Sequence, residues 1–260
     1  MNNASVLDKM VVVFGASGFL GSHVADALSG AGYQVRLFDH ISSPYQRIDQ
    51  EMIVGDIMDI DQVIEATRGA HAVYNFAAIA DIDEAHNKPV ATATINVLGN
   101  MHVLEAARIA GANRFVFASS VYVYSESGSF YRASKQAAER FTETYHDRYG
   151  LDYTILRYGS LYGRRADLRN GIYRMLHEAI QKHSITYHGS GNAMREYIHV
   201  EDAARMSVQV LSPEFANRHL ILTGQERMRI RDVMTMISEI MPWNVELHFE
   251  EANAISHYEI

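Results

Sequence analysis

Along most of the chain, segments with a strand-type pattern of apolar positions take turns with segments that have a helix-type pattern. Continuous apolar runs are typical of parallel strands buried on both faces, and segments with helical spacing follow them. Strands are predicted at Met10–Phe14, Tyr33–Phe38, Met52–Val54, Ala72–Phe76, Arg114–Ala118 and Tyr153–Arg157. Helices are predicted from the glycine-rich turn to Leu28 and at Asp61–Thr67, Asn96–Ala110 and Tyr131–Tyr149. This alternation predicts an α/β fold with a doubly wound parallel sheet.

Beyond about Gly163 the alternation becomes irregular. Helices are expected at Gly171–His183, Glu201–Leu211 and Ile230–Ile240, and short strands at Ile185–His188 and Leu220–Leu222. We therefore divide the chain into a dinucleotide-binding domain, residues 1–163, and a second part, residues 164–260. The second part is expected to hold the last sheet elements and a small C-terminal substrate lobe, interleaved with the first.

A glycine-rich turn joins the first predicted strand to its helix. Gly15, Gly18 and Gly21 stand at the spacing G-x-x-G-x-x-G. The first glycine permits a tight turn, the second lets the backbone approach a pyrophosphate, and the third allows close packing of helix on strand. The free N–H groups of the helix N-terminus then face the phosphates. The loop predicts a Rossmann-type dinucleotide site.

An acid at the end of the second strand selects the dinucleotide. Asp39 can accept hydrogen bonds from both hydroxyls of an adenine ribose and would repel a 2′-phosphate, so NAD is favoured over NADP. Arg36 lies inside the strand and is interpreted as a surface residue. Asp56 follows the third strand, where it serves either the adenine amino group or a turn.

A Tyr-x-x-x-Lys pair opens the predicted helix Tyr131–Tyr149. The chain has 15 tyrosines and four lysines, and Tyr131 with Lys135 is the one pair at this spacing. The i, i+4 spacing places both side chains on one helix face. A neighbouring ammonium favours the phenolate, which can take a proton from a substrate hydroxyl. Ser119 and Ser120 follow the strand ending at Ala118, at the edge where open α/β sheets bind ligands.

Composition excludes several other classes of function. The formal net charge of −8 argues against nucleic acid as a general partner. The absence of cysteine removes disulfides, thiolate metal sites and cysteine nucleophiles, and it fits a reducing cytoplasm. Glu143 and His146 have metal-compatible spacing but no second ligand cluster, so no metal site is predicted. Neither a membrane span nor a signal peptide is predicted.

The ordered set of motifs resembles the extended short-chain dehydrogenase/reductases, in particular the NAD-dependent epimerase/dehydratase group acting on nucleotide-sugars. The resemblance covers nearly the whole chain. Besides the glycine loop and Tyr131-x-x-x-Lys135, its motifs are Asp39, Gly55-Asp56-Ile57, Asn75-Phe76-Ala77-Ala78, Asn96-Val97-x-Gly99, Ser119-Ser120-Val-Tyr-Val-Tyr124, Leu156-Arg157-Tyr158 and Arg195-Glu-Tyr-Ile-His-Val200-x-Asp202.

The resemblance implies roles for individual residues. Ser120, Tyr131 and Lys135 would be the catalytic trio, with Lys135 also holding the nicotinamide ribose. Further cofactor-binding positions would be Phe19, Leu20, His40, Asp56, Ile57, Phe76, Ala77, Ala78, Asn96 and Tyr158. Arg195 would clasp the diphosphate of a nucleotide-sugar, and Ser160 stands where many members bind substrate phosphate through Asn.

The chain also departs from the family pattern. Ser120 and Tyr131 are only 11 residues apart, which predicts a short loop and an open substrate site. Val121 and Tyr122 stand where dehydratases carry an Asp-Glu pair and decarboxylases a Glu, which argues against both reactions. The chain ends at Ile260, about 50 residues earlier than is usual in the family, and the sequence leaves open whether it is naturally short or truncated.

These observations favour a nucleotide-sugar epimerase or oxidoreductase in which Tyr131 acts as acid and base at sugar C4. Two alternatives stay open, a dehydrogenase or 4-ketoreductase without epimerisation and a non-catalytic NAD-binding regulatory protein. The resemblance also implies a homodimer through helices 96–110 and 131–149. Met101, Leu104, Phe141 and Tyr145 are candidates for its apolar surface, with packing on the sheet as the alternative.

Overall fold

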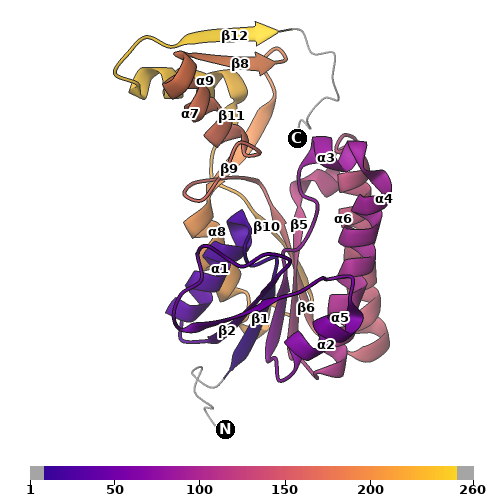
Figure 1. Ribbon diagram of the computed structural model, residues 1–260. Helices are drawn as coiled ribbons and strands as arrows, with labels where there is room; N and C mark the ends of the chain where they lie inside the picture. Colours follow the sequence, from indigo (N-terminus) through magenta and orange to yellow (C-terminus); the bar gives the residue numbers. More distant parts are fainter. Residues whose placement is uncertain (1–8, 251–260) are drawn as a thin grey trace.

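The larger part of the molecule is a seven-stranded sheet. The computed structural model describes residues 9–250 (Figure 1). The sheet order is β10-β6-β5-β4-β1-β2-β3, and neighbouring strands are parallel. Its strands are β1 (Met10–Phe14), β2 (Gln34–Asp39), β3 (Gln50–Val54), β4 (Ala72–Asn75), β5 (Arg114–Ser120), β6 (Tyr153–Tyr158) and β10 (Arg218–Leu222). The predicted doubly wound sheet is confirmed.

Helices cover both faces of this sheet (Figure 1). The two sets are α1 (Phe19–Gly30) with α8 (Val200–Gln209), and α2 (Ile60–Thr67), α5 (Asn100–Ile109) and α6 (Ser129–Tyr149). Alternate residues of β1 enter separate cores, so Val11 and Val13 pack on one side while Val12 and Phe14 pack on the other. Burial on both faces explains why β1 is a continuous apolar run rather than an alternating one.

The segment between β4 and α5 differs from the prediction. A single helix over Asn96–Ala110 was expected, but α3 (Ile82–Asn87), α4 (Pro89–Ala93) and a π-helix, Thr94–Gly99, precede α5. Within the π-helix, Asn96 donates to the carbonyl of Ile79 at 3.0 Å and accepts from its N–H at 2.7 Å. The irregular turn therefore ties this helical run to the loop that follows β4.

A smaller lobe lies beyond the carboxyl ends of the large sheet (Figure 1). It contains a three-stranded sheet, a two-stranded sheet and two helices, which share their own apolar core. Its elements are β7 (Ser160–Tyr162), α7 (Gly171–Lys182), β8 (Ser184–His188), β9 (Met194–His199), β11 (Arg227–Arg229), α9 (Ile230–Ile240) and β12 (Glu246–Glu250). Between β9 and β11 the chain returns to the large sheet as α8 and β10, so the two parts are interleaved.

Sequence patterns identified the helices of this lobe but missed four of its strands. β7, β9, β11 and β12 are short, and none of them is a run of fully buried residues. Such segments give neither a continuous apolar run nor a clear alternation. Two 3₁₀-helices, Val121–Tyr124 and Pro213–Phe215, complete the described elements. Across residues 9–250 no helix is long and apolar enough to cross a membrane.

Candidate active site

The glycine loop connects β1 to α1 at the carboxyl edge of the large sheet. Gly15 has φ of +74°, and an added Cβ would lie 2.5 Å from the backbone nitrogen of Ala77. A Cβ on Gly21 would lie 2.2 Å from the carbonyl oxygen of Gly15. Gly18 is the N-cap of α1 and offers no side-chain cap. Phe19 and Leu20 begin the helix, so its first N–H groups face the space where a pyrophosphate would bind.

Asp39 fixes this loop from the end of β2. Its Oδ2 accepts from the N–H of Ser17 at 2.9 Å, and its Oδ1 accepts from the N–H of His40 at 2.8 Å. The exposed ring of His40 also contacts Oδ1, at 2.7 Å. Arg36 is paired instead with Glu51 at 2.7 Å. An acid at this edge fits the hydroxyls of an adenine ribose.

Residues after β3 make local contacts. Asp56 accepts from the N–H of Met58 at 2.9 Å, which corresponds to the turn-forming role left open by the sequence. The carbonyl of Ile57 contacts Nδ1 of His102 at 3.0 Å, and a Cβ on Gly99 would lie 3.3 Å from Ile57. Both Asp56 and Ile57 therefore shape the loop after β3, and their contact with the cofactor stays a prediction.

The loop after β4 forms the next part of the candidate site. Phe76, Ala77 and Ala78 are half-buried, and the ring of Phe76 stacks on Tyr74 with centroids 6.0 Å apart. Tyr158 lies 6.4 Å from Phe76, centroid to centroid, and its hydroxyl bonds Ser207 of α8 at 2.6 Å. Burial raises the pKa of Tyr158 well above its ordinary range. Its ring, not its hydroxyl, is thus the part next to this loop.

Asn96 joins the same loop to α6. Besides its two bonds to Ile79, its Nδ2 donates to Ser134 Oγ at 3.0 Å, and Ser134 in turn donates to the carbonyl of Tyr131 at 2.7 Å. Asn96 is 2% exposed, so its side-chain amide makes these hydrogen bonds in the protein interior. These contacts position the first turn of α6, which carries Tyr131 of the Tyr-x-x-x-Lys pair.

Ser120, Tyr131 and Lys135 meet at the carboxyl end of β5. Ser120 is the last residue of β5, while Tyr131 and Lys135 lie one turn apart on α6. The Lys135 Nζ donates to the carbonyl of Ala118 at 2.7 Å and lies 5.8 Å from the centroid of the Tyr131 ring. The structure therefore brings together the three side chains predicted as the catalytic trio.

Burial sets the protonation of this trio. It raises the pKa of Tyr131 to about 12, and the hydrogen bond with Ser120 opposes that rise. Burial lowers the pKa of Lys135 to about 8, and the negative charge of Glu139 opposes that fall. Because desolvation disfavours each charged form, a Tyr131 phenolate needs nearby positive charge, which the Lys135 ammonium supplies.

Arg195 and Ser160 lie on strands of the smaller lobe. Arg195 lies on β9, is 7% exposed, and donates from Nη1 to the carbonyl of Met194 at 2.8 Å. Burial raises the pKa of Tyr122, and it raises the pKa of Tyr197 to about 12. The charge of Arg195 opposes both rises. Ser160 begins β7 and pairs with Tyr197 across the small sheet. Arg195 thus acts on Tyr122, two residues beyond Ser120.

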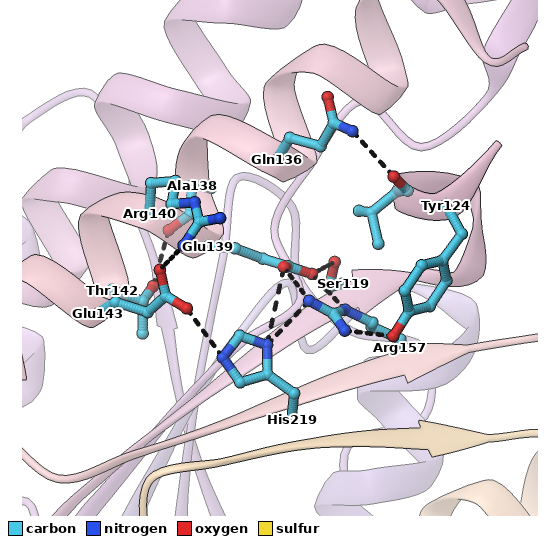
Figure 2. A network of polar contacts seen from close by, with 11 residues as sticks. Ser119, Tyr124, Gln136, Ala138, Glu139, Arg140, Thr142, Glu143, Arg157 and His219 are labelled. Carbon is cyan, nitrogen blue, oxygen red and sulfur yellow. Dashed lines mark hydrogen bonds and ion pairs between the residues drawn. The ribbon is translucent and has the colours of Figure 1, made fainter. Parts of the chain in front are cut away.

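A polar cluster behind the trio was missed by sequence reasoning (Figure 2). Glu139 of α6 binds Ser119 of β5 and Arg157 of β6, and Arg157 contacts His219 of β10. One signal was available, because Glu139 follows Lys135 by one helical turn on the same face. The partners on β6 and β10 come from distant parts of the chain and left no local pattern.

The glycine loop at a helix N-terminus, the acid after β2 and the Tyr–Lys pair beside β5 define a class of protein, the NAD-binding enzymes with a Rossmann sheet. Within residues 9–250, no group of three or more His, Asp or Glu side chains is placed to hold a metal ion.

Comparison with known proteins gives the family. The model of the NAD dependent epimerase/dehydratase family matches residues 11–221, and the chain belongs to this family, whose members are NAD-dependent enzymes. UDP-glucose 4-epimerase of Mycolicibacterium smegmatis is 29% identical over 228 residues, 78% of this chain and 73% of that protein. UDP-glucuronic acid decarboxylase 1 of Arabidopsis thaliana is 27% identical over 225 residues, 74% of this chain and 49% of that protein.

A solved structure supports the same fold. UDP-N-acetylglucosamine 4-epimerase from Methanobrevibacter ruminantium, in complex with UDP-N-acetylmuramic acid, matches with a TM-score of 0.89. The two chains are 24% identical, and the match covers 97% of this chain and 88% of that one. Relatives with epimerase and decarboxylase names are thus similarly distant in sequence, and overall identity does not separate the two reactions.

Proposed function

We propose that the protein is an NAD-dependent nucleotide-sugar 4-epimerase that interconverts UDP-sugars differing in configuration at C4. The observation that carries this proposal is the convergence of Ser120, Tyr131 and Lys135 at the end of β5, at the same edge of the parallel sheet as the glycine loop. Relatives and structural neighbours named as UDP-glucose and UDP-N-acetylglucosamine 4-epimerases support the substrate class.

Tyr131 is the acid and base of the proposed reaction. Its phenolate takes the proton from the C4 hydroxyl while the C4 hydride leaves, and it returns that proton when the hydride comes back to the opposite face of the 4-keto sugar. NAD, when bound, accepts and returns the hydride. Ser120 bonds both Tyr131 and the substrate oxygen, and the Lys135 ammonium stabilises the phenolate.

The residues after Ser120 favour epimerisation over elimination or decarboxylation. Val121 is buried, and Tyr122 places its ring edge against Tyr131 with centroids 6.2 Å apart. An aromatic ring and an aliphatic side chain therefore occupy the positions at which dehydratases and decarboxylases carry acids. Neither side chain has a carboxylate that could act on the sugar. Hydride and proton transfer at C4 is therefore the reaction that the residues at the end of β5 support.

NAD would be held by groups already described. The loop of Gly15, Gly18 and Gly21 would receive the pyrophosphate, Asp39 the adenine ribose, and Lys135 the nicotinamide ribose. The smaller lobe would act as the substrate domain, with Arg195 offering a planar cation to the diphosphate. Ser160 would serve as a neutral donor to the same phosphates.

We also infer a homodimer in a reducing, cytoplasmic compartment. Phe141 of α6 and Ile109 of α5 are exposed on the helices expected at the interface. Leu104 does not contribute, because it is fully buried against the sheet, and Tyr145 is half-buried and bonds Glu105. Light scattering at micromolar concentration tests the dimer, and a monomer mass would reject it. The lack of cysteine supports the compartment.

One experiment tests the activity. The purified protein is incubated with UDP-glucose, UDP-galactose, UDP-N-acetylglucosamine or UDP-glucuronate, and products are separated by chromatography while absorbance at the NADH band is followed. Inversion at C4 without net NADH is expected. Net NADH formation would indicate a dehydrogenase, and no turnover of any of the four sugars would reject the proposed substrate class.

A further inference from the structure

Three ionisable side chains lie on one face of α6 at intervals of four residues. They are Tyr131, Lys135 and Glu139, and the last two are 4% and 6% exposed. Burying a carboxylate costs several kcal/mol unless charged and hydrogen-bonding partners compensate. Glu139 takes no part in the proton and hydride steps described above. Its burial one turn beyond Lys135 therefore needs a separate explanation.

The partners of Glu139 are specific (Figure 2). Its Oε1 accepts from Ser119 Oγ at 2.5 Å and from Arg157 Nε at 3.0 Å, and its Oε2 accepts from Arg157 Nη2 at 2.6 Å. This two-point pairing with a planar guanidinium fixes the carboxylate in position and orientation. Glu139 thereby bridges the helix of the catalytic pair to the strand that carries Ser120.

The far side of Arg157 is also occupied. Its Nη2 donates to Nδ1 of His219 at 2.9 Å, so the hydrogen bonds assign the ring proton to Nε2, which donates to Glu143 at 2.9 Å. Its Nη1 donates to the hydroxyl of Tyr124. Arg157 is therefore held on three sides, and it can hold the Glu139 carboxylate facing the interior.

Consecutive residues of β5 receive these contacts. Ala118 accepts the hydrogen bond of Lys135, Ser119 donates to Glu139, and Ser120 bonds Tyr131. A displacement of this strand end would change all three contacts together. The carboxylate of Glu139 thus lies where it can influence both the charge of Lys135 and the position of Ser120.

We propose that Glu139 is a positioning residue for the catalytic trio, supplying the negative charge that keeps Lys135 an ammonium at neutral pH and anchoring the end of β5 through Ser119. The proposal rests on the proposed function for its consequence in catalysis. Its electrostatic part concerns Lys135 alone and is measurable whether or not a substrate is turned over.

The sign of the effect follows from the surroundings of Lys135. Burial lowers the pKa of Lys135 to about 8, and Glu139 is the charged group that raises it. The other ionisable groups around this part of the sheet are Tyr131 and Glu143 on α6, Tyr122 and Tyr124 on the 3₁₀-helix, Arg157 on β6 and His219 on β10. Removing the charge of Glu139 leaves burial unopposed, so the pKa of Lys135 must fall.

The test is a direct titration of Lys135. Because the chain has only four lysines, protein labelled with ¹³C at lysine Cε gives a simple NMR spectrum, in which Lys135→Arg identifies the Lys135 signal. The wild type is expected to titrate near pH 8. In Glu139→Gln the midpoint is expected about one pH unit lower, as for loss of a single neighbouring charge.

Two variants separate charge from shape. Glu139→Asp keeps the charge and shortens the reach, so its Lys135 midpoint should stay near that of the wild type. Glu143→Gln lies one turn further along α6, leaves the contacts of Glu139 intact, and should also leave the midpoint unchanged. A wild-type midpoint in Glu139→Gln, or equal falls in the Gln and Asp variants, would overturn the proposal.

The pH profile of turnover carries the same expectation into catalysis. The alkaline limb of kcat should move to lower pH by about one unit in Glu139→Gln, with KM for the UDP-sugar little changed. If that variant does not fold, Glu139→Gln combined with Arg157→Gln removes both buried charges and should still lower the Lys135 midpoint. A wild type inactive on all UDP-sugars would reject the proposed function and leave the titration as an independent test of Glu139.

Discussion

The two parts of the molecule reach their stability differently. In the large sheet, β4 and β5 are buried from end to end, and they end in the polar residues Asn75 and Ser120. In the smaller lobe, short and half-buried strands surround one modest core, and β9 carries the buried cation of Arg195. A rigid sheet suits the groups that must keep the geometry of a reaction, whereas the lobe can vary with the substrate.

The sharpest test of this division compares two tyrosines, one from each part. Tyr131→Phe removes the acid and base of the sheet region and should lower kcat about 10³-fold, because proton transfer by a positioned group contributes that order of rate. Tyr197→Phe in β9 should raise KM for the UDP-sugar a few-fold and leave kcat nearly unchanged. Steady-state kinetics measure both.

The same two variants can contradict this division of roles between the large sheet and the smaller lobe. If Tyr197→Phe lowered kcat as much as Tyr131→Phe, the lobe would share the chemistry. If Tyr131→Phe kept full turnover, the assignment of the base would be wrong. Circular dichroism and bound-nucleotide content of each variant show whether the fold and the cofactor site persist.

A second test concerns the space in the glycine loop. Gly21→Ala places a methyl group against the carbonyl of Gly15, where 2.2 Å is available, so the loop or the helix must shift. We expect a loss of about 3 kcal/mol in unfolding free energy and at least a 100-fold loss of NAD affinity. Thermal unfolding and fluorescence titration with NAD give the two values.

The same helix provides the matched control. A Cβ on Gly30 meets nothing within 4 Å, and Gly30 has no positive φ. Gly30→Ala should therefore stabilise the protein by about 0.5 kcal/mol or more and leave NAD affinity unchanged. Equal effects of the two substitutions would show that helix propensity, rather than the crowded loop, governs this segment.

The third test concerns Asp39 and the choice of dinucleotide. Asp39→Asn loses the charged acceptor for the ribose hydroxyls and should weaken NAD binding about 10-fold, since a hydrogen bond to a charged group contributes roughly 1.5–3 kcal/mol. Discrimination against NADP should fall at the same time. Asp49→Asn is the control, because this exposed acid pairs with Arg47 at 2.8 Å before β3. If Asp39→Asn left the discrimination against NADP unchanged, Asp39 would not be the residue that binds the adenine ribose.

What the sequence predicted depends on how local each signal is. β1, the glycine loop and the Tyr131–Lys135 pair are local patterns, so residues close in sequence carry the whole signal. The contact of Glu139 with Arg157, by contrast, depends on the packing of α6 on β6, and that of Arg157 with His219 on the pairing of β6 with β10. The sheet and the catalytic trio were accessible from sequence, while the cluster that supports the trio was not.

Individual misses have physical causes. β9 contains charged, aromatic and aliphatic residues that are buried to different degrees, so Met194–His199 shows no clean period. Leu104 looked available for a dimer contact because its helix is amphipathic, yet the sheet covers it completely. Side-chain patterns show that a face is apolar, and only the tertiary structure shows which element covers it.

The variant with the smallest expected effect on activity tests whether the lobe is an independent unit of stability. Met234 of α9 is fully buried in the core of the lobe, and Met234→Ala leaves a cavity costing about 2–5 kcal/mol there. Because this core is separate from the two cores of the large sheet, hydrogen exchange should accelerate in α7, α9 and β8 while β1 and β5 keep their protection. KM for the UDP-sugar should rise a few-fold, with NAD affinity unchanged.

Leu104→Ala is the matched control, because it removes a fully buried side chain from a core of the large sheet. It should weaken NAD binding together with global stability. Loss of NAD binding in Met234→Ala would show that the two parts unfold as one, and the proposed separation between reaction geometry and substrate recognition would then have no basis in stability.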